Sequence, residues 1–175
     1  MDAIECILTR RSCRKYLDKA VEEDVLNKVL ECARYAPSGK NAQNWHFIVI
    51  SNKEVLDRIS LEISKVDKRP NYSVTYGAPV LIIVTGKKDS SLSVYDGSCA
   101  LENIFLGAHA LGLSTCWIHQ LTYPEVVENV SLYEYLYQLG LPRDEKVIGC
   151  SALGYAFEEN KTTLPRKENT VIYVK

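Results

Sequence analysis

Residues 78–86, Ala-Pro-Val-Leu-Ile-Ile-Val-Thr-Gly, constrain the fold most, because they form a nearly continuous apolar run that is rich in β-branched side chains. Pro79 and Gly86 bound the run. A short apolar run between such residues is typical of a fully buried strand. The run therefore predicts the central strand of a sheet that other elements must cover.

Other segments supply the remaining elements. Residues 45–50, 114–118, 146–156 and 170–174 are predicted strands from their β-branched, aromatic or glycine-interrupted apolar content. Apolar residues spaced i, i+3, i+4 predict helices over residues 2–9, 22–36, 53–64 and about 92–111, with one or two more within 123–139. Residues 65–77 form a polar connection. We expect one α+β domain, residues 1–175, in which helices cover a sheet.

The short helix at 2–9 and the long helix at 92–111 have distinct apolar patterns. The first has Ile4, Ile7 and Leu8 on one face. The second is apolar nearly all round after Asn103, which predicts a core helix. Gly112 follows it and fits a C′ glycine cap.

Charge and targeting signals exclude several classes of protein. The formal net charge is −1, which gives no field that predicts nucleic acid or an anionic membrane as a partner. The first 16 residues have an acid before their apolar run and arginines after it, the reverse of a signal peptide. No apolar run reaches the roughly 20 residues that span a bilayer. We expect a soluble cytoplasmic protein.

The cysteines and histidines indicate neither a disulfide framework nor a metal site. The six cysteines are scattered, without a C-x-x-C pair. We expect them to be small buried side chains in a reducing compartment. The three histidines show no ligand spacing with the cysteines, so no metal is predicted.

The stretch Ala-Pro-Ser-Gly-Lys-Asn-Ala-Gln-Asn-Trp, residues 36–45, contains a Gly-Lys pair that invites comparison with a phosphate-binding loop. The Walker A pattern fails, because Arg34 stands where its first glycine belongs and Asn41 where Ser or Thr belongs. The stretch also follows a helix and precedes a strand, the reverse of that motif. No G-x-G-x-x-G sequence supports a Rossmann dinucleotide site either.

Three arginines lie within five residues of Thr-Arg-Arg-Ser-Cys-Arg-Lys-Tyr, residues 9–16. Guanidinium groups bind phosphate bidentately, and Ser12 adds a neutral donor, so the segment is a candidate anion site. Spacing alone slightly favours a solvated or ion-paired helix end over such a site. A basic pair at residues 166–167 could join the site or could be a solvated turn.

Residues 96–120 combine the core helix, its glycine cap and a strand ending in Trp-Ile-His-Gln. Such a strand end could bring backbone N–H groups close to a flat aromatic ligand. Periodicity alone favours a core helix and strand without a ligand.

Taken together and in order, these motifs resemble the nitroreductase family of FMN-dependent enzymes. The matching stretches cover nearly the whole chain. They are R-R-S-C-R, A-P-S-G-K-N-A-Q-N-W-H-F, G-A-P-V-L-I-I-V, the run D-G-S-C-A-L-E-N to G-A-H-A-L-G-L-S-T-C-W-I, and L-G-Y before a late basic residue.

The resemblance implies a fold, a cofactor and an activity. The fold is a mostly antiparallel mixed sheet covered by helices, in an intertwined homodimer with two sites at the interface. FMN is bound without covalent attachment. A hydride passes from NADH or NADPH to flavin N5, and the electrons then pass to a second substrate, such as a nitroaromatic or a quinone, in a ping-pong cycle.

The resemblance also assigns roles to residues of this chain. The FMN phosphate and ribityl chain would be held by Arg10, Arg11, Ser12 and Arg14, with Arg166 completing the phosphate site. The flavin of the opposite subunit would be reached by Pro37, Ser38 and Asn41. The ring itself would be contacted by Asn71 at its pyrimidine edge and by Ile118 and His119, whose backbone N–H groups would lie near N5 and O4.

Several alternatives remain open at the level of sequence. His119 is a candidate proton donor, although a single histidine at a strand end is commonly structural. The flavin carries the hydride chemistry, so no catalytic side chain is required. The chain could instead be an FMN-binding sensor or electron-transfer module without nicotinamide-driven turnover. From the arginines alone, an anion-binding or nucleic-acid-binding protein is a third hypothesis, which the balanced charge disfavours.

Two departures from the family pattern bear on the substrate pocket. Gln43-Asn44-Trp45 stands where the family often has Gln-Pro-Trp, so we expect a looser turn into the strand. The chain is also short for the family, which predicts an open pocket without extra covering helices.

Overall fold

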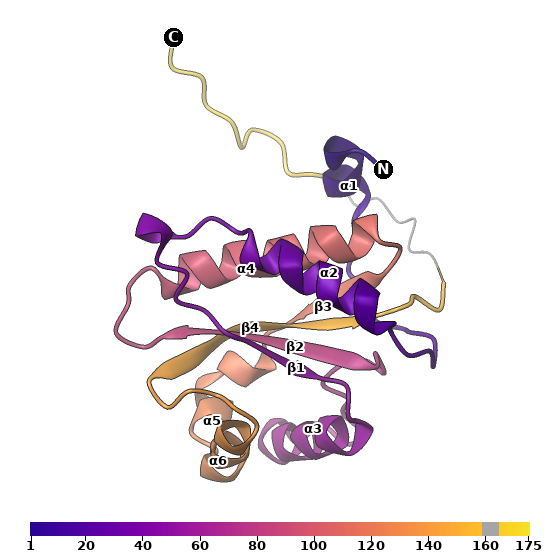
Figure 1. The fold of residues 1–175 in the computed structure, drawn as a ribbon, viewed down its shortest axis with the longest axis vertical. Coiled ribbons are helices and arrows are strands. Elements are labelled where there is room, and N and C mark those ends of the chain that lie inside the picture. The colour runs from indigo at the N-terminus through magenta and orange to yellow at the C-terminus, as the bar shows by residue number, and fades with distance from the viewer. Residues whose placement is uncertain (159–164) are drawn as a thin grey trace.

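Strand β2 (Val80–Lys87) lies in the interior of the sheet in the computed structural model, which describes residues 1–158 and 165–175 (Figure 1). The sheet has four strands in the order β1-β2-β4-β3, and every pairing between them is antiparallel. The other strands are β1 (Phe47–Ile50), β3 (Ser114–Ile118) and β4 (Glu145–Gly154). The predicted central strand and the α+β class are confirmed.

Helices cover both faces of this sheet (Figure 1). Helices α2 and α4 lie on one face, and α3, α5 and α6 lie on the other. The helices are α1 (Ala3–Thr9), α2 (Glu23–Arg34), α3 (Lys53–Asp67), α4 (Ser93–Ala110), α5 (Pro124–Val127) and α6 (Val130–Gln138), with two short 3-10 helices, η1 (Gly39–Asn41) and η2 (Gln120–Thr122).

Alternate residues of β2 pack into two separate cores. Val80, Ile82 and Val84 pack on the side of α2 and α4, whereas Leu81 and Ile83 pack on the side of α3 and α6. Their side chains are 0–1% exposed. Full burial of such a side chain contributes about 1.5–3 kcal/mol each. The two-sided packing explains why the run is apolar without alternation.

Helix α4 is the core helix that its pattern predicts. Ala100, Leu101, Ile104 and Ala108 are fully buried, and α4 contacts α2, β2, β3 and β4. Its C-terminal end is fixed by the glycine cap at Gly112.

That cap is a Schellman motif. Gly112 has a φ of +78°, which glycine adopts without steric cost. Its N–H donates to the carbonyl of His109 at 3.1 Å, and the N–H of Leu113 donates to the carbonyl of Ala108 at 2.8 Å. The cap turns the chain directly into β3.

The N-terminal segment extends the sheet beyond β3. Ser12 forms an isolated parallel bridge with Thr115, and the N–H of Cys13 donates to the Thr115 carbonyl at 2.8 Å. Tyr16 forms a second, antiparallel bridge with Ala156. The parallel bridge gives the otherwise antiparallel sheet the mixed character that was expected.

Of the two terminal predictions, the strand near the C-terminus is wrong and the N-terminal helix is confirmed. No strand forms at residues 170–174: this segment is exposed, Val174 at 95%, and runs away from the sheet in Figure 1. A strand needs a hydrogen-bonding neighbour, which the tail does not reach within its own chain. Helix α1 forms as predicted, but its apolar residues Ile4, Ile7 and Leu8 are 54–67% exposed.

Two internal predictions also change. Helix α3 continues to Asp67, past the predicted end at 64, and takes the first residues of the segment expected to be a polar connection. The cysteines are all free, but Cys99 is exposed and Cys32 is half-buried, whereas the other four are buried as expected.

Among the described residues, no helix is long and apolar enough to cross a membrane. That part of the chain also holds no group of three or more His, Cys, Asp or Glu placed for a metal ion.

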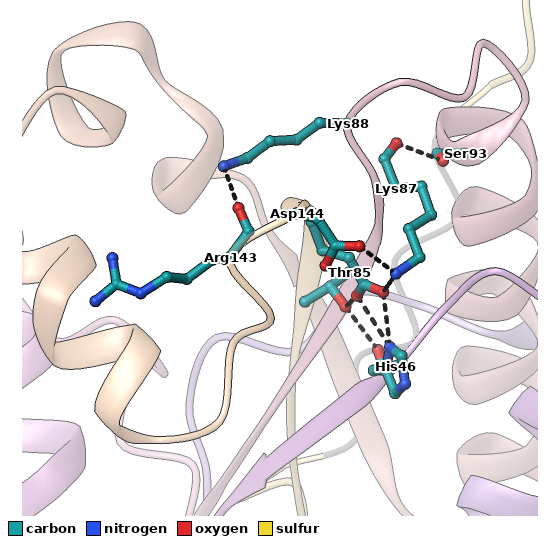
Figure 2. A network of polar contacts seen from close by, with 8 residues as sticks. His46, Thr85, Lys87, Lys88, Ser93, Arg143 and Asp144 are labelled. Atoms are coloured by element: carbon teal, nitrogen blue, oxygen red, sulfur yellow. Dashed lines mark hydrogen bonds and ion pairs between the residues drawn. The ribbon is translucent and has the colours of Figure 1, made fainter.

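A buried carboxylate joins the ends of three strands (Figure 2). Glu145, at the start of β4, is 0% exposed. It accepts hydrogen bonds from the Thr85 hydroxyl and from Lys87 Nζ at 3.2 Å, and its Oε1 lies 2.9 Å from His46 Nδ1. Lys87 also contacts Asp144 at 2.7 Å. Burial raises the pKa of Glu145, but the bonds from Thr85, His46 and Lys87 outweigh it and leave that pKa below its ordinary value.

The depressed pKa of Glu145 predicts how the stability of the protein depends on pH. The ionised carboxylate contributes to the free energy of unfolding. That contribution is fully present above the unfolded-state pKa, about 4.3, and is lost as pH falls through the folded-state value. We expect Glu145→Gln to lower the free energy of unfolding by about 1–3 kcal/mol at pH 7, because Lys87 loses its buried anion. The difference from wild type should shrink below about pH 4.

Urea unfolding at pH 7 and at acid pH measures this difference. Glu128→Gln, at an exposed position at the end of α5, is the matched control and should change stability little. A pH-independent difference for Glu145→Gln would show that the ionised carboxylate is not the stabilising form.

Candidate functional site

The arginine segment lies against the edge of the sheet. The ring under Arg10, Phe105, belongs to the core on the side of α2 and α4, whereas the ring under Arg14, Tyr76, packs against the core on the side of α3 and α6. The parallel bridge at Ser12 sets this segment alongside β3. Arg14 therefore runs beside the end of the strand that leads into Ile118 and His119.

Arg10 and Arg14 each lie over an aromatic ring. The Arg10 Cζ is 5.7 Å from the centroid of the Phe105 ring on α4, and its Nε is 3.8 Å from Glu102 Oε1. The Arg14 Cζ is 5.9 Å from the centroid of the Tyr76 ring. Stacking on these rings leaves the guanidinium edges able to donate to an anion.

Arg11 lies elsewhere. Its Nη1 donates to the carbonyls of Leu8 at 2.8 Å and of Arg10 at 2.7 Å. With Cys13 it lines a cavity of about 500 Å³ between α1, the end of α4 and the end of β4, to which His109 and Tyr155 also contribute. The structure therefore separates the Arg11 side chain from those of Arg10 and Arg14.

Ile118 and His119 end β3 as the sequence indicates. The Ile118 side chain is 0% exposed within the core, so only its backbone is available to a ligand. The His119 N–H donates to the Gln120 side-chain oxygen at 3.2 Å. The imidazole Nε2 lies 3.1 Å from the Thr122 hydroxyl, and the ring packs edge-on against Tyr123, with centroids 5.6 Å apart.

The 36–45 stretch is a compact loop that packs on the first turn of α4. The Ser38 hydroxyl accepts from the Gln43 N–H at 3.1 Å, and the Asn41 N–H donates to the Ser38 carbonyl at 3.0 Å. The Gly39 N–H donates to Asp96 Oδ1 at 3.0 Å. Pro37 and Asn41 are exposed, and Ser38 is half-buried.

The loop and Arg10 contact α4 at different heights. The loop contacts the first turn through Asp96, whereas Arg10 contacts Glu102 and Phe105 farther along. A rise of about 1.5 Å per residue separates Asp96 from Phe105 by about 14 Å along the helix axis. Helix α4 thus holds the loop and Arg10 apart within one chain.

The remaining two predicted residues are exposed. Asn71 follows α3 with a φ of +56°. Arg166 lies in the C-terminal segment beyond the undescribed residues 159–164, and Figure 1 shows this segment extending away from the sheet.

Sequence reasoning missed the residues that support the site. Phe105 and Tyr76 lie under the two arginines, and Asp96 anchors the loop. Asp96 falls in the D-G-S-C motif, so a signal was present. Nothing in the pattern marks Tyr76, whose role depends on a tertiary contact.

The Cys116 thiol, on β3 beside this region, is not a nucleophile. Burial raises the pKa of Cys116, and the positive charges of Arg14 and Arg10 lower it by less. A protonated thiol is a poor nucleophile. The arrangement therefore favours binding and orientation of a ligand over covalent catalysis by the chain.

Comparisons with known proteins identify the family of the chain. The model of the Nitroreductase family matches residues 7–155. A Methanothermobacter thermautotrophicus protein with the provisional name NADH dehydrogenase/NAD(P)H nitroreductase is 40% identical over 136 residues, covering 74% of this chain and 67% of that protein. An Archaeoglobus fulgidus protein with the same provisional name is 33% identical over 161 residues, covering 90% of this chain and 87% of that protein.

Solved structures extend the match to the whole chain. The crystal structure of a nitroreductase with bound FMN from Bacteroides fragilis is 35% identical, covers 100% of both chains and has a TM-score of 0.88. An FMN-dependent nitroreductase from Clostridium difficile R20291 is 31% identical, with a TM-score of 0.82 over 98% of this chain and 99% of that one. The chain belongs to the nitroreductase family.

Proposed function

We propose that the protein is an FMN-dependent oxidoreductase that transfers a hydride from NADH or NADPH to a small organic acceptor, nitroaromatic or quinone-like, in a ping-pong cycle. The observation that carries the proposal is the position of Arg10, Ser12 and Arg14 in one short segment that bridges to Thr115 of β3 and runs beside that strand. When bound, FMN supplies the redox chemistry through its N5 atom.

The FMN phosphate is assigned to Arg10, Ser12 and Arg14. Two guanidinium groups and one hydroxyl provide charge-assisted and neutral donors for phosphate oxygens. The Arg11 side chain would join them only after leaving the carbonyls of Leu8 and Arg10. Arg166 would reach the phosphate only if the C-terminal segment packed against the body of a protomer.

The ring system is assigned to the end of β3. The backbone N–H groups of Ile118 and His119 would orient the N5–O4 edge, where donors stabilise negative charge on the reduced ring. The Gln120 side chain occupies the His119 N–H and would have to turn away. Asn71 would contact the pyrimidine edge. His119 stays a candidate proton donor, although Thr122 and Tyr123 hold its ring.

We further propose a homodimer of single-domain chains, 1–175, with the flavin sites between them. The loop with Pro37, Ser38 and Asn41 lies too far along α4 from Arg10 to complete the site of its own chain. A second copy would bring the two groups together. The exposed apolar residues of α1 and of the tail support this, because solvated apolar patches are typical of interfaces.

The first prediction concerns the cofactor. The purified protein should be yellow or become so on reconstitution with FMN, and its flavin absorbance should bleach anaerobically on addition of NADH or NADPH. An acceptor panel of nitroaromatics and quinones then identifies what reoxidises it. A protein that cannot be loaded with FMN would falsify the proposal. Bound FMN that neither nicotinamide reduces would favour a sensor or an electron-transfer module.

The second prediction separates the phosphate from the ring. Replacing both Arg10 and Arg14 by Ala should weaken FMN binding at least about a hundredfold, because each charge-assisted hydrogen bond contributes about 1.5–3 kcal/mol. Binding of riboflavin, which lacks the phosphate, should stay nearly unchanged. Fluorescence titration measures both affinities.

The control for these arginines is Arg58→Ala with Arg143→Ala, which removes the same charge from α3 and from the connection between α6 and β4, outside the arginine segment. Those arginines lie over Tyr135 and Tyr137. The control pair should leave FMN affinity unchanged. Equal loss of FMN and riboflavin binding in the Arg10/Arg14 variant would place the phosphate elsewhere.

The third prediction tests whether one site uses two chains. A chain with Ser38→Ala and Asn41→Ala is co-expressed with a chain carrying Arg10→Ala and Arg14→Ala, and the mixed dimer is isolated through two different tags. One of its two sites then has every wild-type group. We expect one tightly bound FMN per mixed dimer, whereas neither parent dimer binds tightly. No gain over the parents would mean that each site belongs to one chain.

A further inference from the structure

The loop that presents Ser38 and Asn41 has a backbone that does not hold its shape by local preference. Lys40, Asn41 and Gln43 have φ angles of +56°, +54° and +50°. Residues other than glycine rarely adopt this region, and such conformations persist only where the surroundings impose them. The loop therefore needs fixed contacts outside itself.

Asp96 supplies one such contact. Its Oδ1 accepts the Gly39 N–H at 3.0 Å across 57 positions of sequence, and its side chain is only 8% exposed. A partly buried carboxylate that accepts a backbone N–H makes a stronger bond than a neutral acceptor would.

Close packing at Gly39 adds a second constraint from the same turn of α4. A Cβ on Gly39 would lie 2.4 Å from Leu92 Cδ1, so the loop backbone sits closer to the helix than a side chain at this position would allow. Gly39 is thus held by a hydrogen bond to Asp96 and by contact with Leu92.

The placement of the Ser38 and Asn41 side chains, on either side of Gly39, depends on where the Gly39 backbone is held. The Ser38 hydroxyl accepts from the Gln43 N–H at 3.1 Å, and the Asn41 side-chain oxygen accepts from Gln43 Nε2 at 3.1 Å. These bonds connect parts of the loop only to one another. The bond from Gly39 to Asp96 connects them to the body of the protein.

The turn of α4 that carries Asp96 is itself tied to the sheet (Figure 2). The Ser93 hydroxyl donates to the Lys87 carbonyl at 2.8 Å. Lys87 contacts Glu145, which also holds His46 at the far end of the loop. The loop is therefore fixed at Gly39, through Asp96 and the first turn of α4, and at its C-terminal end, through His46. Both connections lead to the corner of the sheet where β2 ends and β4 begins.

We propose that Asp96 is a positioning residue, which holds the 38–43 loop in the shape that presents Ser38 and Asn41 to the isoalloxazine ring of the neighbouring subunit's FMN. The inference rests on the proposed function. Asp96 does not touch the flavin and acts through Gly39. Because the loop contacts the ring and the arginines contact the phosphate, loss of Asp96 must weaken FMN and riboflavin alike.

The test compares three replacements of Asp96 in the full-length protein. Asp96→Ala removes the acceptor, Asp96→Ser leaves a hydroxyl too short to reach Gly39, and Asp96→Asn keeps an oxygen at the Oδ1 position. We expect the Ala and Ser variants to bind FMN and riboflavin about tenfold or more weakly, by equal factors, since a hydrogen bond to a charged group is lost. The Asn variant should retain affinity within about threefold.

Asp24→Ala is the matched control, since Asp24 is an exposed acid in the first turn of α2. It controls for loss of a favourable charge at a helix N-terminal end and should leave both affinities unchanged. Amide hydrogen exchange provides a readout that needs no flavin. The Gly39 and Gln43 amides should exchange at least about tenfold faster in the Ala and Ser variants than in the Asn variant.

The outcomes separate the two proposals. Wild-type protein that binds neither flavin would overturn the proposed function, and the exchange rates would still decide whether Asp96 holds the loop. Wild-type flavin affinity in both the Ala and the Ser variants overturns the positioning role. Weaker binding of FMN with unchanged binding of riboflavin also overturns the positioning role. Such a selective loss is expected only when contacts to the phosphate are removed.

Discussion

The burial of β2 on both faces is the constraint on which the rest of the structure depends. A strand with five consecutive apolar side chains, Val80 to Val84, can be stable only between two covering layers, and these residues alternately fill two separate cores. Helices α2 and α4 cover one face, and α3 and α6 cover the other. The candidate site lies at the edge of the sheet, where β3 ends and α4 supports both Arg10 and the loop.

Helix α4 connects the two halves of the candidate site without joining them in one pocket. Phe105 supports Arg10, and Asp96 supports Gly39, at heights that one rigid helix keeps apart. The same rigidity would fix the distance between the two halves when two copies associate. A binding site divided in this way links cofactor affinity to the association of the chains, because each chain contributes some of the residues that contact the cofactor bound by the other.

The fold followed closely from sequence because its main signals are local. The apolar run at 78–86, the core helix and the cap at Gly112 each specify an element by spacing or by backbone chemistry. The prediction at 170–174 was wrong because β-propensity reports the side chains and not the presence of a neighbouring strand. Likewise, Arg10, Arg11 and Arg14 look equivalent in sequence, and only their tertiary contacts show that Arg10 and Arg14 lie over aromatic rings whereas Arg11 bonds to nearby carbonyls. Asp96 and Tyr76 act through tertiary contacts that no local pattern encodes.

The register of residues 10–14 against β3 has a consequence for how the chain can vary. The bridge at Ser12 and the hydrogen bond from the Cys13 N–H to the Thr115 carbonyl fix this segment beside the strand. Insertion or deletion of a single residue between Cys13 and Arg14 would leave that bridge in place but would displace Arg14 from the Tyr76 ring. In this segment the number of residues is therefore under tighter constraint than the identity of most of them.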